Sequence, residues 1–403
     1  MGVVLDIRHL RKTDLPAYGQ LMQYAFNGSN NLRDRYVDFV GHFLASTFGV
    51  FEGKRLMAGM WYYPFDMRVG ADVLPMGGVA AVATWPDARN AGLVARLMKA
   101  AHDQMRKEGR ALGALMPFRN SFYGRMGYAD VFYHNEWNFA PEDLVRPARH
   151  AARARMVDGH RVREQIEAVH QSAGGNRFGT VRRDKVLWTA RLLPDDDQMR
   201  KTFLIERGRD LVGFVVARHA VDPGSQKRDL FVEQAVWCDP DALRAILELI
   251  WVHRDHLRKV KWYLPTDVDL FPFFKDAITP DVRLKHKMMF KLVDLKGAIE
   301  QRIYPDDLDG EVTLNVEGDA TGVWNTGYWR ITFGGGSARV QKLRQRPRGR
   351  IPSCDIQTLS ILYSGYRSAT ELAALGSVSF PANERALLER AFPRGVPYMQ
   401  EWF

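Results

Sequence analysis

A strand that runs through a short turn into an amphipathic helix is the feature that most restricts the fold of this 403-residue chain. The strand is expected at Val79–Val82, where apolar residues follow one another without interruption. The helix is expected from about Gly92 to Glu108, because apolar residues recur on one face at Leu93, Val94, Leu97, Met98, Ala101 and Met105. Together with the strand-rich segments before and after it, this unit predicts a mixed α+β fold.

The turn that precedes this helix has the features of an anion site. The first turn of a helix leaves about four backbone N–H groups unpaired and carries a partial positive charge, so anions bind there readily. Gly92 lets the backbone approach a pyrophosphate closely, and Arg89 and Asn90 stand at the mouth of the turn. The turn lacks both the Gly-Lys-Ser/Thr ending of a P-loop and the spaced glycines of a dinucleotide site. An ordinary strand–helix connection with an exposed arginine is the alternative.

The length of the chain predicts roughly two or three domains. A change of composition across 140–159, with Pro141, Pro147 and a cluster of basic residues, indicates a crossover between domains. The strand and helix pattern then partly repeats without a second phosphate turn, and it changes again at about Lys287. We therefore expect domains at residues 1–140, 141–286 and 287–403.

Composition restricts the compartment and the partners. No apolar run reaches the ~18–20 residues that span a membrane, and the first residues lack the pattern of a signal peptide. Cys238 and Cys354 are too few for a disulfide framework, so we expect a cytoplasmic protein. The net charge of +10 suits anionic ligands. Its basic residues are dispersed and lack interleaved aromatic residues, so we expect no nucleic-acid partner.

Two further groups could carry acid–base chemistry. Tyr123 lies in the segment Met116–Tyr128, where a strand ends at Pro117 and a short helical turn precedes Gly127. Its phenol, with an ordinary pKa of about 10, can donate a proton to a leaving group. A half-buried structural tyrosine is the alternative. Phe403 ends the chain and carries a free carboxylate with an ordinary pKa of about 3.5.

These motifs resemble the GNAT (Gcn5-related N-acetyltransferase) family, and within it the Eis (enhanced intracellular survival) type. The resemblance rests on the Arg-x-x-Gly-Leu turn at 89–93, the Phe-Tyr-Gly-Arg-Met-Gly-Tyr segment at 122–128, the stretch Cys354–Leu372, the total length and the final Phe403. It spans essentially the whole chain. It implies two tandem GNAT domains, the second degenerate, followed by a sterol-carrier-like domain. It also implies acetyl-CoA as donor, a primary amine as acceptor and a homo-hexamer.

The resemblance assigns the site residue by residue. Tyr123 would be the general acid and the carboxylate of Phe403 the general base, in a direct transfer without a covalent enzyme intermediate. The donor would be bound by Val82, Ala83 and Thr84 along the pantetheine arm, by Arg89, Asn90, Ala91, Gly92, Leu93, Val94 and Ala95 at the pyrophosphate, and by Phe118 and Arg119. No metal is expected, because His253 and His256, on an expected helix, lack the adjacent glutamate of a zinc motif.

The chain departs from the family pattern at three places. Relatives usually carry two or three basic residues before the glycine, where this chain has Arg89–Asn90–Ala91. They often have Ser–Glu at Phe118–Arg119, and some place an acid at Trp402. These departures leave the identity of the acceptor open between an aminoglycoside, another polyamine and a lysine side chain. Acids that could bind such a cation are Asp34, Asp38, Asp66 and Glu401.

The acceptor pocket and the reaction class have alternatives. The aromatic residues Phe26, Trp61, Tyr62, Tyr63 and Phe65 could line an acceptor pocket or belong to the core. An acyltransferase with a longer acyl donor, such as an N-myristoyltransferase, is a second reading, against which the third-domain resemblance argues. A non-catalytic acyl-CoA or lipid binding protein is a third.

Overall fold

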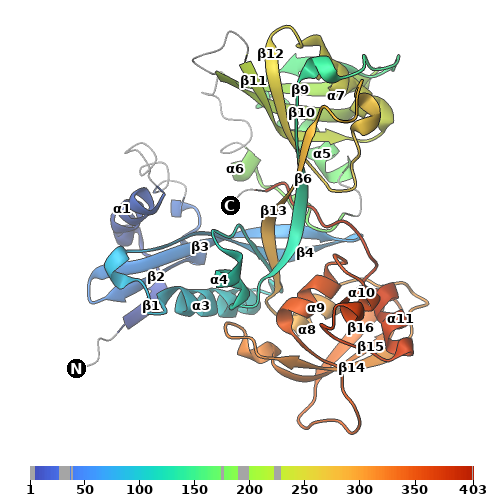
Figure 1. Ribbon diagram of the computed structural model, residues 1–403. Coiled ribbons are helices and arrows are strands. Elements are labelled where there is room, and N and C mark those ends of the chain that lie inside the picture. Colours follow the sequence, from blue (N-terminus) through green and yellow to red (C-terminus); the bar gives the residue numbers. More distant parts are fainter. Residues whose placement is uncertain are drawn as a thin grey trace. The chain divides into compact units, whose positions relative to one another are not determined.

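The computed structural model describes residues 5–26, 37, 40–173, 177–188, 199–221, 228–401 and 403. These residues form two compact units. The first contains the chain up to Phe132, Lys287–Pro397 and the last residues from Glu401; the second contains Tyr133–His286 and Tyr398–Gln400. Strands β6 (Ala129–Phe139) and β13 (Asp281–Leu292) carry the chain from one unit to the other (Figure 1).

The N-terminal part of the first unit is a mostly antiparallel sheet with the strand order β1-β2-β3-β4-β5-β13. Strands β4 and β5 run parallel, and helix α3 lies in the connection between them. The elements are β1 (Leu5–His9), η1 (Lys12–Asp14), α1 (Leu15–Ala25), η2 (Leu44–Ser46), β2 (Thr47–Glu52), β3 (Arg55–Val69), β4 (Asp72–Thr84), η3 (Pro86–Ala88), α3 (Leu93–Lys107), β5 (Leu112–Leu115) and α4 (Asn120–Gly124).

The helix predicted after the turn is confirmed as α3. Its apolar stripe is buried at Leu93, Leu97, Met98, Ala101 and Met105, and these side chains join one hydrophobic cluster with residues of β2, β3 and β4. The hydrophobic effect therefore packs α3 against these strands.

Strand β3 continues through a proline. Pro64 lies opposite Gly77 in the β3–β4 ladder. The other neighbour, β2, pairs with β3 only as far as Trp61. Because β3 has no β2 partner beyond that point, a residue without an N–H group can be accommodated there.

The C-terminal part of the first unit is an α+β layer around a sheet of order β16-β15-β14-β17. Inward-facing Val312, Leu314 and Val316 of β14 alternate with more exposed residues, as expected for a sheet covered on one face. The elements are α8 (Leu295–Glu300), β14 (Gly310–Glu317), η7 (Val323–Asn325), β15 (Gly327–Gly334), β16 (Ser337–Lys342), β17 (Ser353–Asp355), α9 (Ile356–Tyr363), α10 (Ala369–Ala374) and α11 (Ala382–Ala391), shown in Figure 1.

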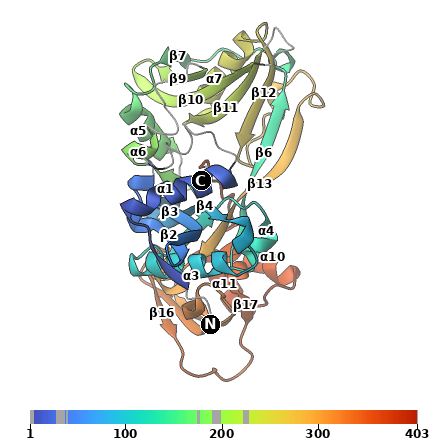
Figure 2. The same cartoon turned by 90° about the vertical axis from the view of Figure 1, so that its left-hand side faces the viewer.

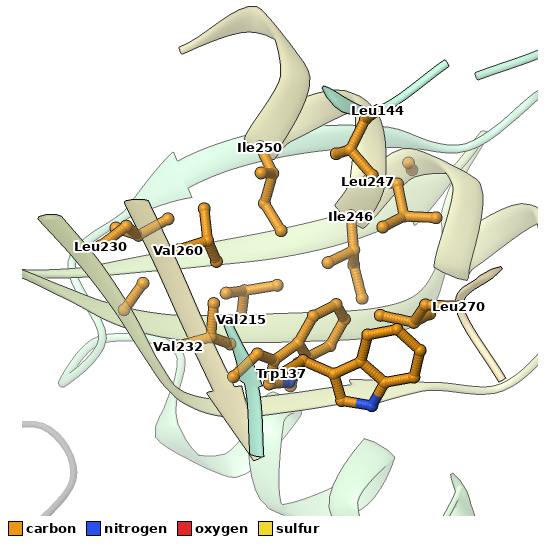
Figure 3. Close-up of a cluster of buried hydrophobic side chains, with 14 of the residues drawn as sticks. Trp137, Leu144, Val215, Leu230, Val232, Ile246, Leu247, Ile250, Val260 and Leu270 are labelled. Carbon is orange, nitrogen blue, oxygen red and sulfur yellow. The ribbon is translucent and has the colours of Figure 1, made fainter. Parts of the chain in front are cut away.

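The second unit has a sheet of order β6-β12-β11-β10-β9-β7, in which β11 and β12 are parallel and α7 makes the crossover. Side chains from α7 and the sheet form its core around Trp137, Ile246 and Val260 (Figure 3). The elements are η4 (Pro141–Asp143), β7 (Arg153–Val157), α5 (Arg163–Ala173), β8 (Val181–Arg182), α6 (Lys185–Leu187), β9 (Arg200–Arg207), β10 (Asp210–Val221), β11 (Arg228–Trp237), α7 (Pro240–Val252), β12 (Leu257–Leu264) and η6 (Phe271–Phe273), most of them labelled in Figures 1 and 2.

The end of α7 corrects one detail of the sequence analysis. The helix stops at Val252, so His253 and His256 follow it instead of sharing one of its faces. Among the described residues, no group of three or more histidine, cysteine, aspartate or glutamate side chains is placed to bind a metal ion. In the same part of the chain, no helix has the length and apolar character needed to cross a membrane.

Gly127 provides a test of how tightly the two parts of the first unit pack. Its φ is +89°, and an added Cβ would lie 2.8 Å from both Ile356 Cγ2 and Lys291 Nζ. We expect Gly127→Ala to lower the free energy of unfolding by about 2–5 kcal/mol, the sum of left-handed backbone strain and overpacking. Chemical denaturation measures this loss.

The matched control is Gly109→Ala, because Gly109 also has a positive φ (+74°) but has nothing within 4 Å of the added Cβ. The free energy of unfolding of this variant should fall by only about 1–2 kcal/mol, the cost of placing a residue other than glycine in the left-handed conformation. Equal losses for the two variants would contradict the close packing at Gly127.

Candidate functional site

The end of strand β4 is interrupted by a bulge. Ala83 pairs with Gly59 and Ala80 with Trp61, so two residues of β4, Ala81 and Val82, lie opposite one residue of β3. Ala81 has a φ of +48°, which is uncommon for a residue other than glycine. A bulge of this kind locally disrupts the ladder and leaves its extra residue unpaired.

The end of β4 also lacks a paired neighbour on its parallel side. The parallel β4–β5 ladder ends at Val79 and Leu115, and β4 continues beyond it through Thr84. Ala83 is buried, whereas Val82 and Thr84 are half-buried. The three residues predicted to face the pantetheine arm thus lie on a strand segment that extends past its parallel neighbour and has a bulge on its antiparallel side.

The start of α3 is an uncapped helix end. Its N-cap, Gly92, has a φ of +70° and no side chain, and no acidic residue lies in the first turn. The first intrahelical bond runs from the Arg96 N–H to the Gly92 carbonyl, at 3.3 Å. The N–H groups of Leu93, Val94 and Ala95 therefore have no partner within the helix.

The backbone before α3 curves toward the same point. Asn90 has a φ of +64°, so two left-handed residues, Asn90 and Gly92, flank Ala91. Backbone turns of this type gather N–H groups into anion-binding concavities. Arg89, Asn90, Ala91 and Gly92 are all exposed, so an anion in solution can reach them.

Charges around this turn favour an anion. The carboxylate of Asp87 in η3 is paired with Arg55 at 2.6 Å, a contact that holds the pKa of Asp87 below its ordinary value. The start of α7 is different, because the Asp239 side chain accepts the Ala242 N–H at 2.9 Å and occupies the N-terminus with a carboxylate. Of these two helix starts, the one at α3 therefore suits a phosphate better.

Two features of the donor side were missed in the sequence. The Thr84 hydroxyl oxygen is buried and has no hydrogen-bond partner among the described residues, so the side chain as well as the backbone of Thr84 is available to a ligand. Arg96 and Lys99 are exposed on the first turns of α3, after Gly92, whereas the family pattern has its basic residues before the glycine. The i, i+3 spacing of these two cations was the available signal.

Tyr123 is buried on the short helix α4. It is 4% exposed and packs edge-on against Phe122 and Phe118, with ring centroids 5.1 and 5.6 Å away. Burial raises the pKa of Tyr123 well above its ordinary value. Its hydroxyl forms no hydrogen bond with any residue that the structure describes. The phenol thus stays protonated at neutral and alkaline pH, and its proton is available to a ligand.

The structure brings several of the predicted donor-site residues together. Leu93 and Tyr123 belong to one buried cluster, and Val82 and Val94 pack against that cluster. Phe118 and Arg119, just before α4, are exposed, with Phe118 73% accessible. Tyr123, the uncapped start of α3 and the interrupted end of β4 therefore lie together within the N-terminal part of the first unit.

The chain end docks on the same sheet. The Phe403 ring is 9% exposed and lies 5.3 Å from the Phe65 ring and 5.9 Å from the Tyr63 ring, both on β3. Gly78 of β4 makes room for it, because an added Cβ there would come within 3.0 Å of the Phe403 ring. The terminal residue is thus anchored on β3 and β4, four positions along β4 before Val82, or about 13 Å.

The structure describes only some of the residues that were expected to bind the acceptor. Asp34, Asp38 and Trp402 lie outside the described residues. Asp66 is exposed on β3 and Glu401 is buried. Of the aromatic residues, Trp61, Tyr62, Tyr63 and Phe65 are buried and Phe26 is exposed; the Tyr62 hydroxyl donates to Glu108 at 3.0 Å, which indicates a structural role for that residue.

Comparison with known proteins matches this organisation. Residues 6–131 and 179–295 each match a family model of an acetyltransferase (GNAT) domain, and residues 295–400 match a sterol carrier protein domain. An uncharacterized N-acetyltransferase from Streptomyces avermitilis is 25% identical over 99% of each chain. The predicted α+β fold of two GNAT domains followed by a sterol-carrier-like domain is thereby confirmed.

Solved structures have the same fold. A GCN5-related N-acetyltransferase from Anabaena variabilis superposes with a TM-score of 0.88 at 19% identity, covering 99% of this chain and 100% of that chain. Eis1 from Mycobacterium abscessus superposes with a TM-score of 0.78 at 20% identity, again over 99% and 100%. The resemblance to the Eis type noted in the sequence therefore extends to the fold.

The anchoring of the chain end can be tested without a functional assay. Gly78→Ala places a methyl group 2.7 Å from the Phe65 ring and 3.0 Å from the Phe403 ring. The Phe403 ring should therefore be displaced. We expect carboxypeptidase to release Phe403 from this variant at least tenfold faster than from the parent chain, as followed by mass spectrometry. Gly41→Ala, with nothing within 4 Å of the added Cβ, is the control. Equal release from all three proteins would contradict the anchoring.

Proposed function

Since this chain is a GNAT-type N-acetyltransferase, we propose that it transfers the acetyl group of acetyl-CoA directly to a primary amine. The observation that carries the proposal is the hydroxyl of the buried residue Tyr123, which keeps its proton and has no hydrogen-bond partner among the described residues. It lies in one cluster with the residues at the start of α3 and the end of β4. This arrangement suits a reaction in which a leaving group must be protonated next to a bound phosphate-containing donor.

The proposed donor site follows the geometry of β4 and α3. The pyrophosphate would accept hydrogen bonds from the free N–H groups at the start of α3, with exposed Arg89 and Arg96 nearby. The pantetheine arm would pair with β4 beyond the end of β5, as an added strand does. The proposed donor residues are Val82, Ala83, Thr84, Arg89, Asn90, Ala91, Gly92, Leu93, Val94, Ala95, Phe118 and Arg119.

The proposed transfer requires three proton movements. The acceptor enters as an ammonium, with an ordinary pKa near 10.4, and must lose one proton before its nitrogen attacks the thioester carbon. The new C–N bond forms, backbone N–H groups at the β4 bulge stabilise the oxyanion, and the C–S bond then breaks. The departing thiolate, with a reference pKa near 8.5, takes the proton of Tyr123. The amide nitrogen still carries the second proton of the attacking amine, and this proton passes to the phenolate left at Tyr123, which restores the phenol. The products are the neutral N-acetyl amine and free CoA.

The proposed base is the terminal carboxylate of Phe403. Its ordinary pKa near 3.5 makes it a weak base in water. Removal from solvent strengthens a carboxylate as a base by raising its pKa, and a relay water can connect it to the amine. The aromatic contacts of the Phe403 ring support this role, because they hold the chain end on the sheet that carries the donor strand.

The proposal also covers the class of the acceptor amine, the oligomeric state and the cellular location. The resemblance to the Eis type favours an aminoglycoside, another polyamine or a lysine-like amine, acetylated by a cytoplasmic homo-hexamer. No metal has a part in the proposed chemistry. Aromatic rings near the chain end suit a cationic acceptor, because cations bind to the faces of such rings.

Tyr123→Phe tests the proposed acid. Removing the hydroxyl should lower kcat by about 10²–10⁴, the usual contribution of a general acid, while the Kd for CoA changes little because the ring remains. Release of CoA thiol from acetyl-CoA, measured across a panel of amines that includes neamine, spermidine and Nα-acetyl-lysine amide, gives kcat. Tyr328→Phe, on β15 away from the site, is the control. Undiminished turnover by the Tyr123 variant would exclude this residue as the acid.

Adding one glycine after Phe403 tests the proposed base. The extension keeps the aromatic side chain but replaces its carboxylate with an amide, so kcat/KM for the amine should fall by about 10² or more. Phe403→Leu retains a terminal carboxylate on an apolar residue, so its kcat/KM for the amine should fall much less. The same thiol-release assay measures both. Full turnover by the extended chain would rule out the carboxylate as the base.

A further inference from the structure

Side chains from β13 and from the C-terminal part of the first unit hold the backbone that follows Tyr123. The segment Gly124–Tyr128 presents alternate carbonyl groups, those of Gly124, Met126 and Tyr128, to these side chains. Each of the three accepts a hydrogen bond from a side chain located after residue 290. We call this arrangement the carbonyl clamp.

Gln357, on α9, binds both ends of the segment. Its side-chain amide nitrogen donates to the Gly124 carbonyl at 2.5 Å and to the Tyr128 carbonyl at 2.9 Å. An amide with two donors can bridge two carbonyls in this way. The bridge fixes the distance between the end of α4 and the start of β6.

Lys291 and Thr321 bind the middle of the segment. The Lys291 ammonium donates to the Met126 carbonyl at 2.7 Å and to the Asp319 carboxylate at 2.5 Å, and both side chains of this ion pair are fully buried. The Thr321 hydroxyl lies 2.9 Å from the Met126 carbonyl and 3.1 Å from His102 Nδ1.

The clamped segment closes on Tyr123 itself. The N–H groups of Met126 and Tyr128 donate to the Tyr123 carbonyl at 2.9 and 3.3 Å. The Tyr128 hydroxyl is joined to Thr321 through His102, whose Nε2 lies 2.9 Å from it. The Tyr123 hydroxyl has no hydrogen bond of its own among the described residues. The orientation of the phenol therefore depends on the position of its backbone and on the packing of its ring.

We propose that Gln357, Lys291 and Thr321 are positioning residues that aim the Tyr123 phenol through the carbonyl clamp. Through Gln357 and Thr321, the sterol-carrier-like domain thereby helps to orient the proposed acid during acetyl transfer. This inference rests on the proposed function, in which Tyr123 protonates the departing thiolate. A displacement of about 1 Å at such a group can lower a rate by up to 10², so loss of the clamp should reduce kcat without weakening donor binding.

Gln357→Leu is the direct test, because it removes both donors at nearly constant volume. In the thiol-release assay with acetyl-CoA and the best amine of the panel, kcat should fall about 10- to 100-fold while KM for acetyl-CoA stays within about twofold. The matched control is Gln301→Leu, since Gln301 also donates from this domain to an N-terminal carbonyl, that of Gly109 at 3.3 Å. An unchanged kcat for Gln357→Leu would overturn the proposal.

A double mutant separates positioning from general destabilisation. If Gln357 acts through the phenol, Gln357→Leu should have little effect on the residual single-turnover rate of Tyr123→Phe. Equal fold losses in the two backgrounds would overturn the proposal. Undiminished turnover by Tyr123→Phe alone would instead refute the proposed acid.

A spectroscopic measurement keeps the test independent of catalysis. With 3-fluorotyrosine placed at position 123, the 19F resonance reports the environment of the ring in the full chain. Gln357→Leu should shift or broaden this resonance, and Gln301→Leu should not. An unchanged resonance in the folded Gln357→Leu protein would overturn the clamp even if the acid assignment holds.

Discussion

The arrangement of the site depends on one buried ion pair, that between Lys291 and Asp319. Both side chains are removed from solvent, and burial lowers the pKa of Lys291 to about 8, so the ammonium is retained at neutral pH. Burying two charges costs several kcal/mol each, and the cost is offset only where every remaining donor and acceptor is satisfied. The lysine meets this condition through the Met126 carbonyl and Thr321, and Asn325 donates to the second Asp319 oxygen at 3.0 Å.

The same pair explains why the N-terminal and C-terminal parts of the first unit form one body. Lys291 belongs to β13, which pairs with β5, whereas Asp319 follows β14 of the other sheet. The backbone just after Tyr123 is thus held at Met126 by a residue that comes about 170 positions later in the chain, and the chain end returns to β3 and β4. The proposed acid, the proposed donor strand and the terminal residue thus belong to one compact unit, as acid–base chemistry requires.

Local patterns in the sequence predicted much of this fold, and long-range contacts limited the rest. The apolar stripe of α3 and Gly92 identified the strand–turn–helix unit, because both are local signals. The bulge at Ala81 has no such signal, since an alanine in a left-handed conformation is imposed by tertiary packing. Neither Lys291 nor Asp319 stands out until the fold joins them. The roles given to Tyr123 and Phe403 came from resemblance and stay predictions, which the geometry around them supports.

In the proposed mechanism, the phenol of Tyr123 points at the sulfur of a donor bound between β4 and α3. A crystal structure of the protein with CoA would show this directly. We expect the pyrophosphate on the N–H groups of Leu93–Ala95, the pantetheine arm along Val82–Thr84, and the thiol sulfur within about 3.5 Å of the Tyr123 hydroxyl. A thiol that lies far from this hydroxyl, with another proton donor at the sulfur, would contradict it.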